Sequence, residues 1–253
     1  MLRRFLAALT ASVALAAVSL ASSSGAAFAA STSYVAGMQQ NISDSVVFAN
    51  FGVGKPVLAT GDAQSSAMRV AKGGARDAIA IGWMVNPALN GDSDPHLFVF
   101  WWKNGVGQCY NTSCPGYAAY SGATLAVGQK FTAGSPQRFG IQHSGDEWWL
   151  WAGTSAGVGS YIGYISDSNF AAAWPTFTTV QFYGAVSADL DYPTSQMGNG
   201  YCADDTNALT IGSISYTTSS TVNLTQYATY PRAYSVFKLS ARTFRYGGSG
   251  SCG

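Results

Sequence analysis

The fold class is decided by a stretch in the second half of the chain: Arg138-Phe139-Gly140-Ile141-Gln142-His143, then Ser144-Gly145-Asp146, then Glu147-Trp148-Trp149-Leu150-Trp151-Ala152. The two outer runs are rich in β-branched and aromatic residues, which is typical of strands. The residues between them are a compact turn signal. We therefore predict a β-hairpin over residues 138–152.

The same pattern of short apolar runs, separated by Gly, Asn, Asp, Ser and Pro, extends in both directions along the chain. It predicts further strands at residues 45–51, 78–85, 97–102, 178–185, 208–216 and 235–239. Turn signals stand at Asn90-Gly91-Asp92 and Lys103-Asn104-Gly105, and one short helix is expected at residues 167–173. Helical periodicity is otherwise almost absent. Many short strands joined by polar turns indicate an all-β sandwich or an open barrel in a single domain, residues 31–253.

The first residues have the pattern of an export signal. Arg3 and Arg4 precede an uncharged apolar stretch over residues 5–20, and Ala27-Phe28-Ala29 is an A-x-A cleavage site. A membrane anchor is the alternative, but the stretch is diluted by Ala and Ser and falls short of the ~20 strongly apolar residues of a span. We predict a cleaved signal peptide at residues 1–30 and a secreted protein with no membrane attachment after cleavage.

The charge of the chain does not indicate a polyanionic partner. The sequence holds 13 basic and 12 acidic residues, and loss of Arg3 and Arg4 with the signal leaves 13 − 2 = 11 basic residues and a net charge near −1. Nucleic acid is therefore not an expected partner. Nothing in the sequence indicates an oligomer, and we expect a monomer.

All four cysteines lie in the exported part, at Cys109, Cys114, Cys202 and Cys252. An even number in an oxidising compartment favours two disulfides. Three pairings are possible, and we favour Cys109–Cys114, which closes a short loop, together with Cys202–Cys252. Zinc is the alternative, but the C-x4-C spacing lacks histidines at a useful distance, so neither a metal nor a cofactor is expected. The glycosylation sequon Asn111-Thr112-Ser113 lies between the first two cysteines, and its use stays open.

Residues with catalytic potential are few. Neither His96 nor His143 accompanies a G-x-S-x-G elbow, and both are expected to flank turns. Glu147 is the only glutamate, and aspartates occur in loop-like pairs at Asp92/Asp94, Asp189/Asp191 and Asp204/Asp205. Such pairs could perform acid–base chemistry or hold calcium, but ordinary turn chemistry is the favoured interpretation.

Aromatic residues make up 13% of the chain and are the positive signal for binding. Trp101 and Trp102 should point to opposite faces of their strand, as should Trp148 and Trp149. One member of each pair is therefore expected in the core and the other on an outer face. Exposed rings of this kind suit sugars, prolines and extended peptides alike.

Several stretches resemble neprosin-domain proteins, in order and spacing, from about residue 45 to the C-terminus. The blocks are Ala78-Ile79-Ala80-Ile81-Gly82-Trp83-Met84-Val85, His96-Leu97-Phe98-Val99-Phe100-Trp101, Cys109-Tyr110-Asn111 with Cys114-Pro115-Gly116-Tyr117, Phe182-Tyr183-Gly184-Ala185-Val186 and Gln196-Met197-Gly198-Asn199-Gly200. The resemblance implies a β-sandwich of two antiparallel sheets. It also implies a secreted glutamic peptidase that prefers to cut at proline, works in acid and needs no metal or cofactor.

In that family one glutamate activates water and a second supplies a proton, the first in an I-E-x-G-W block and the second in a G-G-E-V block. The matching positions in this sequence are Ala80 and Ala185, and Glu147 can replace neither. A methyl group cannot take a proton or hold a water, so catalysis is predicted to be impaired or absent. The resemblance predicts that Ala80 and Ala185 face each other across a cleft.

Two interpretations of this cleft remain open. It could bind an extended peptide, such as a proline-rich one, or a glycan, and the candidate lining residues are Trp83, Trp101, Tyr183, Gly184 and Met197. Alternatively, the protein is an active acid peptidase with relocated carboxylates, for which Asp77 and Asp189 are the nearest candidates. By strand alternation Asp77 would face away from the side of Ala80, and Asp189 would lie past its strand end.

Overall fold

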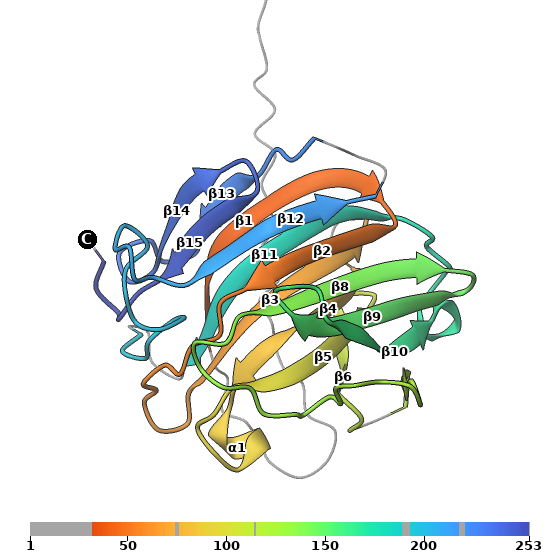
Figure 1. Cartoon of the computed structure of the whole chain (residues 1–253), viewed down its shortest axis with the longest axis horizontal. Helices are drawn as coiled ribbons and strands as arrows, with labels where there is room; N and C mark the ends of the chain where they lie inside the picture. The colour runs from red at the N-terminus through yellow and green to blue at the C-terminus, as the bar shows by residue number, and fades with distance from the viewer. Residues whose placement is uncertain (1–31, 74–75, 114, 189–192, 218–220, 253) are drawn as a thin grey trace, which may run out of the picture.

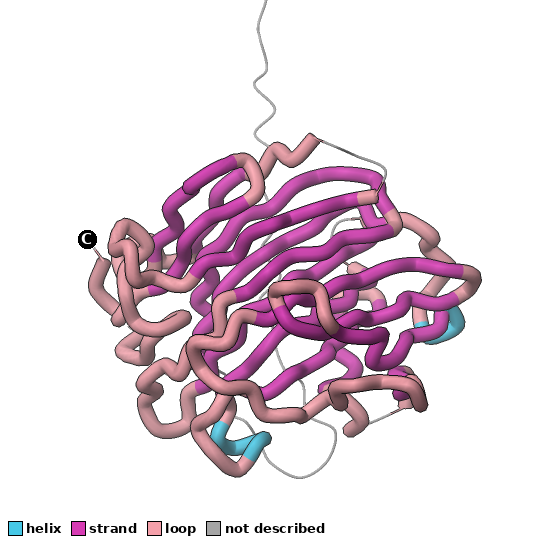
Figure 2. Tube along the Cα trace, viewed as in Figure 1, coloured by secondary structure: helices cyan, strands magenta, loops and turns pink. Residues whose placement is uncertain are grey.

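The computed structural model describes residues 32–73, 76–113, 115–188, 193–217 and 221–252. Two antiparallel sheets pack face to face (Figure 1), and strands dominate the trace, with two short helical turns (Figure 2). These turns are α1, Pro87–Asn90, and the 3-10 turn η1, Asp167–Asn169. The β-sandwich of two antiparallel sheets that the resemblance implies is therefore confirmed. The predicted signal peptide lies outside the described residues.

The strands are listed here by sheet, in spatial order. The seven-stranded sheet consists of β13 (Thr225–Ala228), β1 (Thr32–Asp44), β11 (Phe177–Ala188), β3 (Ala63–Lys72), β4 (Asp77–Val85), β5 (His96–Lys103) and β6 (Val106–Tyr110). The eight-stranded sheet consists of β14 (Ser235–Ser240), β15 (Thr243–Gly247), β12 (Thr210–Tyr216), β2 (Val46–Phe51), β8 (Gln137–Ser144), β9 (Glu147–Thr154), β10 (Gly159–Ser166) and β7 (Tyr117–Ala119). Sequence neighbours pair in the β3-β4-β5-β6 and β8-β9-β10 stretches, while β1 and β11 pair across most of the chain.

The predicted turns have the backbone that their residues favour. Asn104 and Gly105 both adopt positive φ, 52° and 81°, in the turn between β5 and β6. Positive φ at both central residues matches the right-handed twist of a hairpin, which explains the Asn-Gly pair. Gly91, at φ 79°, ends α1 and donates its N–H to the carbonyl of Pro87.

The helix predicted at residues 167–173 is wrong beyond its first turn. Ser166 caps η1 by accepting from the N–H of Ser168, but the turn ends at Phe170, which has an extended backbone. Phe170 is buried and packs edge-on against Trp101 and Trp174. Burial of Phe170 and Trp174 in the core thus overrides the helix propensity of the alanines between them.

The core between the sheets is built from one face of each strand. Trp83 of β4 and Trp148 of β9 are both 0% exposed, and the Trp148 ring packs against the rings of Trp174 and Phe177. The indole N–H of Trp83 donates to the carbonyl of Gly52, which follows β2, at 2.9 Å. This bond joins the two sheets through a side chain that is otherwise wholly apolar.

The opposite face of the seven-stranded sheet, pointing away from the core, is named the groove face. It carries a second apolar cluster that includes Ala67, Ala71, Ala78 and Ala80. At Gly37 and Gly82 a Cβ would lie 2.2 Å and 2.0 Å from a carbonyl oxygen of the adjacent strand, so no side chain fits there. Because these residues are small, the middle of this face is recessed.

Disulfides and an asparagine hold the loops around this sheet. Cys202 and Cys252 are bonded, as predicted, with their Cα atoms 5.5 Å apart. Cys109 is also disulfide-bonded, while its predicted partner, Cys114, lies outside the described residues. The Asn111 side chain is 9% exposed and accepts from the N–H of Val99 at 2.8 Å. The folded chain therefore does not present this sequon side chain to solvent.

Candidate functional site

A groove of about 550 Å³, including the part open to solvent, crosses the groove face over β1, β11, β3, β4 and β5. Its lining is made by four aromatic, four polar and three small or flexible apolar residues: Phe98, Phe100, Trp102, Tyr183; Ser33, Gln64, Ser65, Ser187; Ala63, Met84 and Ala185.

The groove has two chemically different ends. Ser33 and Ser187 are cross-strand partners at one end of the groove, and Ser65 lies two residues along β3 from their row. Phe98, Phe100 and Trp102 follow one another at alternate positions of β5, which places all three side chains on one face. A ligand in the groove would therefore meet hydrogen-bonding groups at one end and rings at the other.

Ala80 and Ala185, the positions where the family has its glutamates, both lie on the groove face. They belong to different rows of cross-strand neighbours. Ala185 pairs with Val35 and Ser65 and lines the groove. Ala80 pairs with Arg69 and Phe100 and is 0% exposed.

The offset between these positions follows from the strand register. The residue of β11 in Ala80's row is Gln181, four residues before Ala185, which is about 13 Å along the strand. Tyr183 lies on β11 midway between them, in a row with Ala67 and Gly82. Ala80 and Ala185 therefore flank the row of Tyr183 and do not face each other directly.

A buried cation lies beside Ala80. Arg69 donates from Nη1 to Oε1 of Gln181 at 2.9 Å, and its guanidinium stacks over the Trp102 ring at 4.9 Å. Burial lowers the pKa of Arg69 and raises the pKa of its neighbours Tyr183 and Tyr227. Arginine remains protonated across the working range of proteins, so this end of the groove face is cationic.

Most of the binding residues predicted from the sequence lie on the wrong side of the sheet. Trp83, Trp101 and Met197 are buried in the core between the sheets. Gly184 also faces the core, where a Cβ would collide with the Tyr246 ring at 2.5 Å. Only Tyr183 lines the groove, because residues an odd number of positions away from Ala80 or Ala185 point to the opposite face.

The groove residues missed from the sequence are chiefly Phe98, Phe100 and Trp102. The expectation that one member of each Trp pair faces outward is confirmed, with Trp102 and Trp149 on outer faces and Trp101 and Trp148 in the core. The alternation that places Ala80 outward could have identified Phe98 and Phe100 through the pairing of β4 with β5.

The relocated carboxylates are not brought to the groove where the structure describes them. Asp77 accepts from the N–H of Asn104 at 2.7 Å and so belongs to the turn after β5. Asp189 lies outside the described residues. Asp62, which precedes the groove residue Ala63, accepts from the hydroxyl of Ser195 at 2.6 Å. Since none of the lining residues is acidic, the groove offers hydrogen bonding and stacking but no carboxyl pair.

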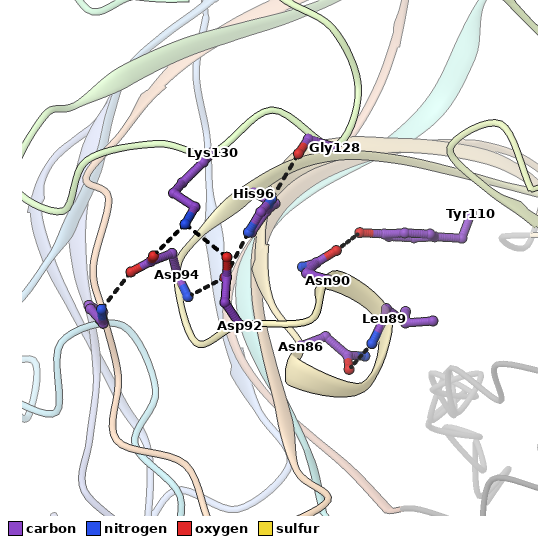
Figure 3. A network of polar contacts seen from close by, with 10 residues as sticks. Asn86, Leu89, Asn90, Asp92, Asp94, His96, Tyr110, Gly128 and Lys130 are labelled. Atoms are coloured by element: carbon purple, nitrogen blue, oxygen red, sulfur yellow. Dashed lines mark hydrogen bonds and ion pairs between the residues drawn. The ribbon is translucent and has the colours of Figure 1, made fainter.

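The aspartates after α1 form a surface network with two lysines and a histidine (Figure 3). Lys130 bonds to both Asp92 and Asp94 at 2.8 Å, and Lys55 bonds to Asp94. His96 lies with Nε2 2.9 Å from Asp92 and Nδ1 2.7 Å from the carbonyl of Gly128. The interpretation of these aspartates as turn residues therefore agrees with their contacts.

This network makes the stability of the folded protein decrease at acidic pH. Hydrogen bonds from Lys130 and then His96 lower the pKa of the Asp92 carboxyl. Above its unfolded-state pKa of about 3.9, such a carboxyl stabilises the folded protein. This contribution is lost as the pH falls below that value. We expect Asp92→Asn to lower the melting temperature at pH 6 and to have a smaller effect at pH 2, by calorimetry. Asp204→Asn, at an exposed turn, is the control, and equal losses at both pH values for Asp92→Asn would contradict this explanation.

Of the residues that the structure describes, neither His143 nor a group of metal-binding side chains forms a second candidate site. His143 Nε2 lies 3.0 Å from Asp167, and both side chains are nearly buried. Among the described residues, no group of three or more His, Cys, Asp or Glu side chains is placed to hold a metal ion. Within the same ranges, no helix is long and apolar enough to cross a membrane.

Comparisons with known proteins agree with the fold of two packed antiparallel sheets. The family model Neprosin matches residues 61–249. Scytalido-glutamic peptidase with a transition state analog inhibitor superposes with a TM-score of 0.52 at 12% identity, covering 87% of this chain and 99% of that chain. A second structure of that enzyme, with a peptide-based transition state analog, gives 0.51 at 10% identity and the same coverage. At these identities the likeness shows a shared fold.

Proposed function

The chain belongs to the neprosin family, and from this premise we propose that it is a secreted binder of extended peptides that no longer hydrolyses them. It would use the groove on the seven-stranded sheet as the binding site. The peptide would lie along the groove with apolar rings, proline included, against Phe98, Phe100 and Trp102.

One observation carries the loss of hydrolysis: among the residues that the structure describes, no carboxylate lines the groove. Acid hydrolysis by a carboxyl pair needs one group to activate water and another to donate a proton. Ala185 lines the groove without such a group, and Ala80 is sealed beneath its neighbours. Tyr183, which stands at the first glycine of the G-G-E-V block, occupies the row between the two alanines.

Binding is supported by what the groove retains. Aromatic side chains contribute most where they are desolvated and held by neighbours, as Trp102 is by Arg69 and Phe100. The serine hydroxyls at the other end can bond to a peptide backbone, which presents a donor and an acceptor at almost every residue. Export is supported by the leader at residues 1–30 and by the Cys202–Cys252 disulfide, since disulfides persist outside the cytosol.

The test combines hydrolysis and binding on the exported protein. We expect no cleavage of a proline-rich substrate between about pH 2 and 6, the range in which carboxyl pairs titrate. Fluorescence anisotropy with a panel of labelled proline-containing hexapeptides should show saturable binding. Trp102→Ala should weaken the tightest complex by about 10- to 30-fold, because loss of a buried aromatic anchor costs about 2 kcal/mol.

Trp149→Ala is the matched control for this variant. Trp149 lies on the outer face of the other sheet, against Tyr120, Tyr161 and Tyr164, and its loss should leave peptide affinity unchanged. Cleavage that Asp77→Asn or Asp189→Asn abolishes would restore the interpretation as an active acid peptidase. Saturable binding of glycans, with none of peptides, would make the protein a carbohydrate-binding module instead.

A further inference from the structure

We propose that the protein binds a neutral polysaccharide on the outer face of the eight-stranded sheet, through a group of aromatic rings. The strands that carry them, β2, β9 and β10, lie with β8 in one stretch of that sheet (Figure 1). This surface is named the ring face, and it consists of Phe48, Trp149, Trp151, Tyr161 and Tyr164. The inference is independent of the proposed function, because the groove lies on the other sheet.

Strand alternation and register bring the five rings together. Trp149 and Trp151 alternate with core residues of β9, so both side chains point outward. Their cross-strand partners on β10 are Tyr164 and Tyr161. Ring centroids lie 4.9 Å apart for Trp149 and Tyr164, and 5.8 Å apart for Phe48 and Trp151. The rings therefore form one surface that extends from β2 to β10.

This surface departs from the usual composition of an outer sheet face. Neither of the two buried apolar clusters includes any of the five rings, and each ring is partly exposed. Tyr120, which is 44% exposed, packs edge-on against Trp149 and extends the surface. The solvent face of an antiparallel sheet is normally polar, and contiguous apolar groups on it mark an interaction site.

Three glycines make room for the rings. A Cβ at Gly140 would lie 2.1 Å from the Phe48 ring. A Cβ at Gly153 or Gly159 would lie 2.7 Å or 2.8 Å from the Trp151 ring. Glycine weakens the interior of a strand, and its presence there often marks a close approach to the backbone. The glycines let both rings lie close to the sheet, which gives a low surface on which a ligand can stack.

The charges on this face favour a neutral ligand. Among the outward residues of β2, β8, β9 and β10, Arg138 and Glu147 are the charged ones, and their charges are opposite. Arg138 bonds to the side chains of Asn50 at 2.9 Å and Ser215 at 3.2 Å. A polyanion, such as a nucleic acid or an acidic polysaccharide, would therefore find no net attraction here.

Polar groups among the rings favour a sugar over an apolar partner. Gln142 lies in the row of Trp149 and accepts from the Tyr161 hydroxyl at 2.5 Å. An apolar protein surface or a lipid tail would take this amide and the tyrosine hydroxyls out of water without supplying new partners, which is costly. A sugar supplies both kinds of contact, since its C–H groups stack on aromatic rings and its hydroxyls bond to amides and hydroxyls.

The extent of the ring face indicates a chain of sugars. From β2 to β10 the rings cross three strand spacings, which is about 14 Å. A single sugar ring covers only part of that distance. The ligand that contacts all five rings is therefore an oligosaccharide or a segment of a polysaccharide.

The experiment is affinity electrophoresis of the exported protein in gels that contain hydroxyethylcellulose, xylan, galactomannan or soluble starch. We expect at least one of these neutral polysaccharides to retard the wild type, and we expect added salt to leave the retardation unchanged. Trp149→Ala should weaken binding to that polysaccharide by about 10-fold or more, the usual effect of removing an aromatic anchor.

Two further variants keep the result interpretable. Tyr164→Ala removes a second ring from the same surface and should also weaken binding, which serves if Trp149→Ala fails to fold. Phe237→Ala is the matched control, because Phe237 is a 48% exposed ring on β14 of the same sheet, outside the ring face. This control should migrate as the wild type does in every gel.

Several results would overturn the inference and leave the proposed function standing. One is the absence of retardation by all the neutral polysaccharides, and another is retardation by polygalacturonate alone. Retardation that Trp102→Ala abolishes and Trp149→Ala does not would place the sugar in the groove. A dimer of the wild type, detected by analytical ultracentrifugation and absent in Trp149→Ala, would mean that the ring face binds a second copy of the chain.

Discussion

Replacing Trp83 with alanine is expected to lower the free energy of unfolding by about 3–5 kcal/mol, the range for removing a large ring from a packed core. Trp83 is wholly buried, and its loss would also remove the bond to the Gly52 carbonyl that joins the two sheets. Urea denaturation of the exported protein, followed by circular dichroism, measures the change.

Two variants separate packing from hydrogen bonding at this position. Trp83→Phe keeps most of the ring but not the N–H, and should cost about 1–2 kcal/mol, the scale of a buried carbonyl left without its donor. Trp149→Ala, on an outer face, should cost less than Trp83→Ala. A loss below about 1 kcal/mol for Trp83→Ala would mean that the core closes over the vacated volume.

Replacing both Cys202 and Cys252 with serine is expected to cost about 4 kcal/mol. The disulfide spans 50 residues, and the chain entropy of a loop of this length in the unfolded state accounts for that figure. The C-terminal segment is also held by non-covalent bonds, since Met197 donates to the carbonyl of Gly248 and Cys252 donates to that of Arg232. Guanidinium denaturation of wild type and the double variant measures the difference.

A loss of less than about 1 kcal/mol in this double variant would contradict the entropic account. It would mean that those backbone bonds already restrain the end of the chain without the disulfide. Ser249→Ala, one residue past Gly248, is a suitable control because it alters the same segment and leaves the disulfide intact.

The strands predicted from the sequence differ in composition from those that were missed. All eight predicted strands are present, from β2 to β14, because each is rich in β-branched or aromatic residues. β1 and β3 were missed although both are central to the seven-stranded sheet. β3 reads Ala-Gln-Ser-Ser-Ala-Met-Arg-Val-Ala-Lys, with little β-propensity. Its small and polar residues suit the groove face, and only the tertiary structure reveals that requirement.

The site was predictable to a limited extent. Ala80 and Ala185, the positions given by the resemblance, lie on the sheet face that carries the groove. Strand alternation, applied from those positions, would have excluded Trp83 and Gly184 and favoured Trp102 over Trp101. The register between non-adjacent strands could not be deduced, because β3, which sets the offset between Ala80 and Ala185, had not been recognised.

The order of the strands also bears on how the protein behaves at high concentration. The seven-stranded sheet ends in β13 and β6, of four and five residues, and the eight-stranded sheet ends in β14 and β7, of six and three. A long exposed edge would offer unpaired backbone groups to a second molecule and promote aggregation. Short edges offer few such groups, so this sandwich resists edge-to-edge growth while its longest strands, β1 and β11, lie inside the sheet.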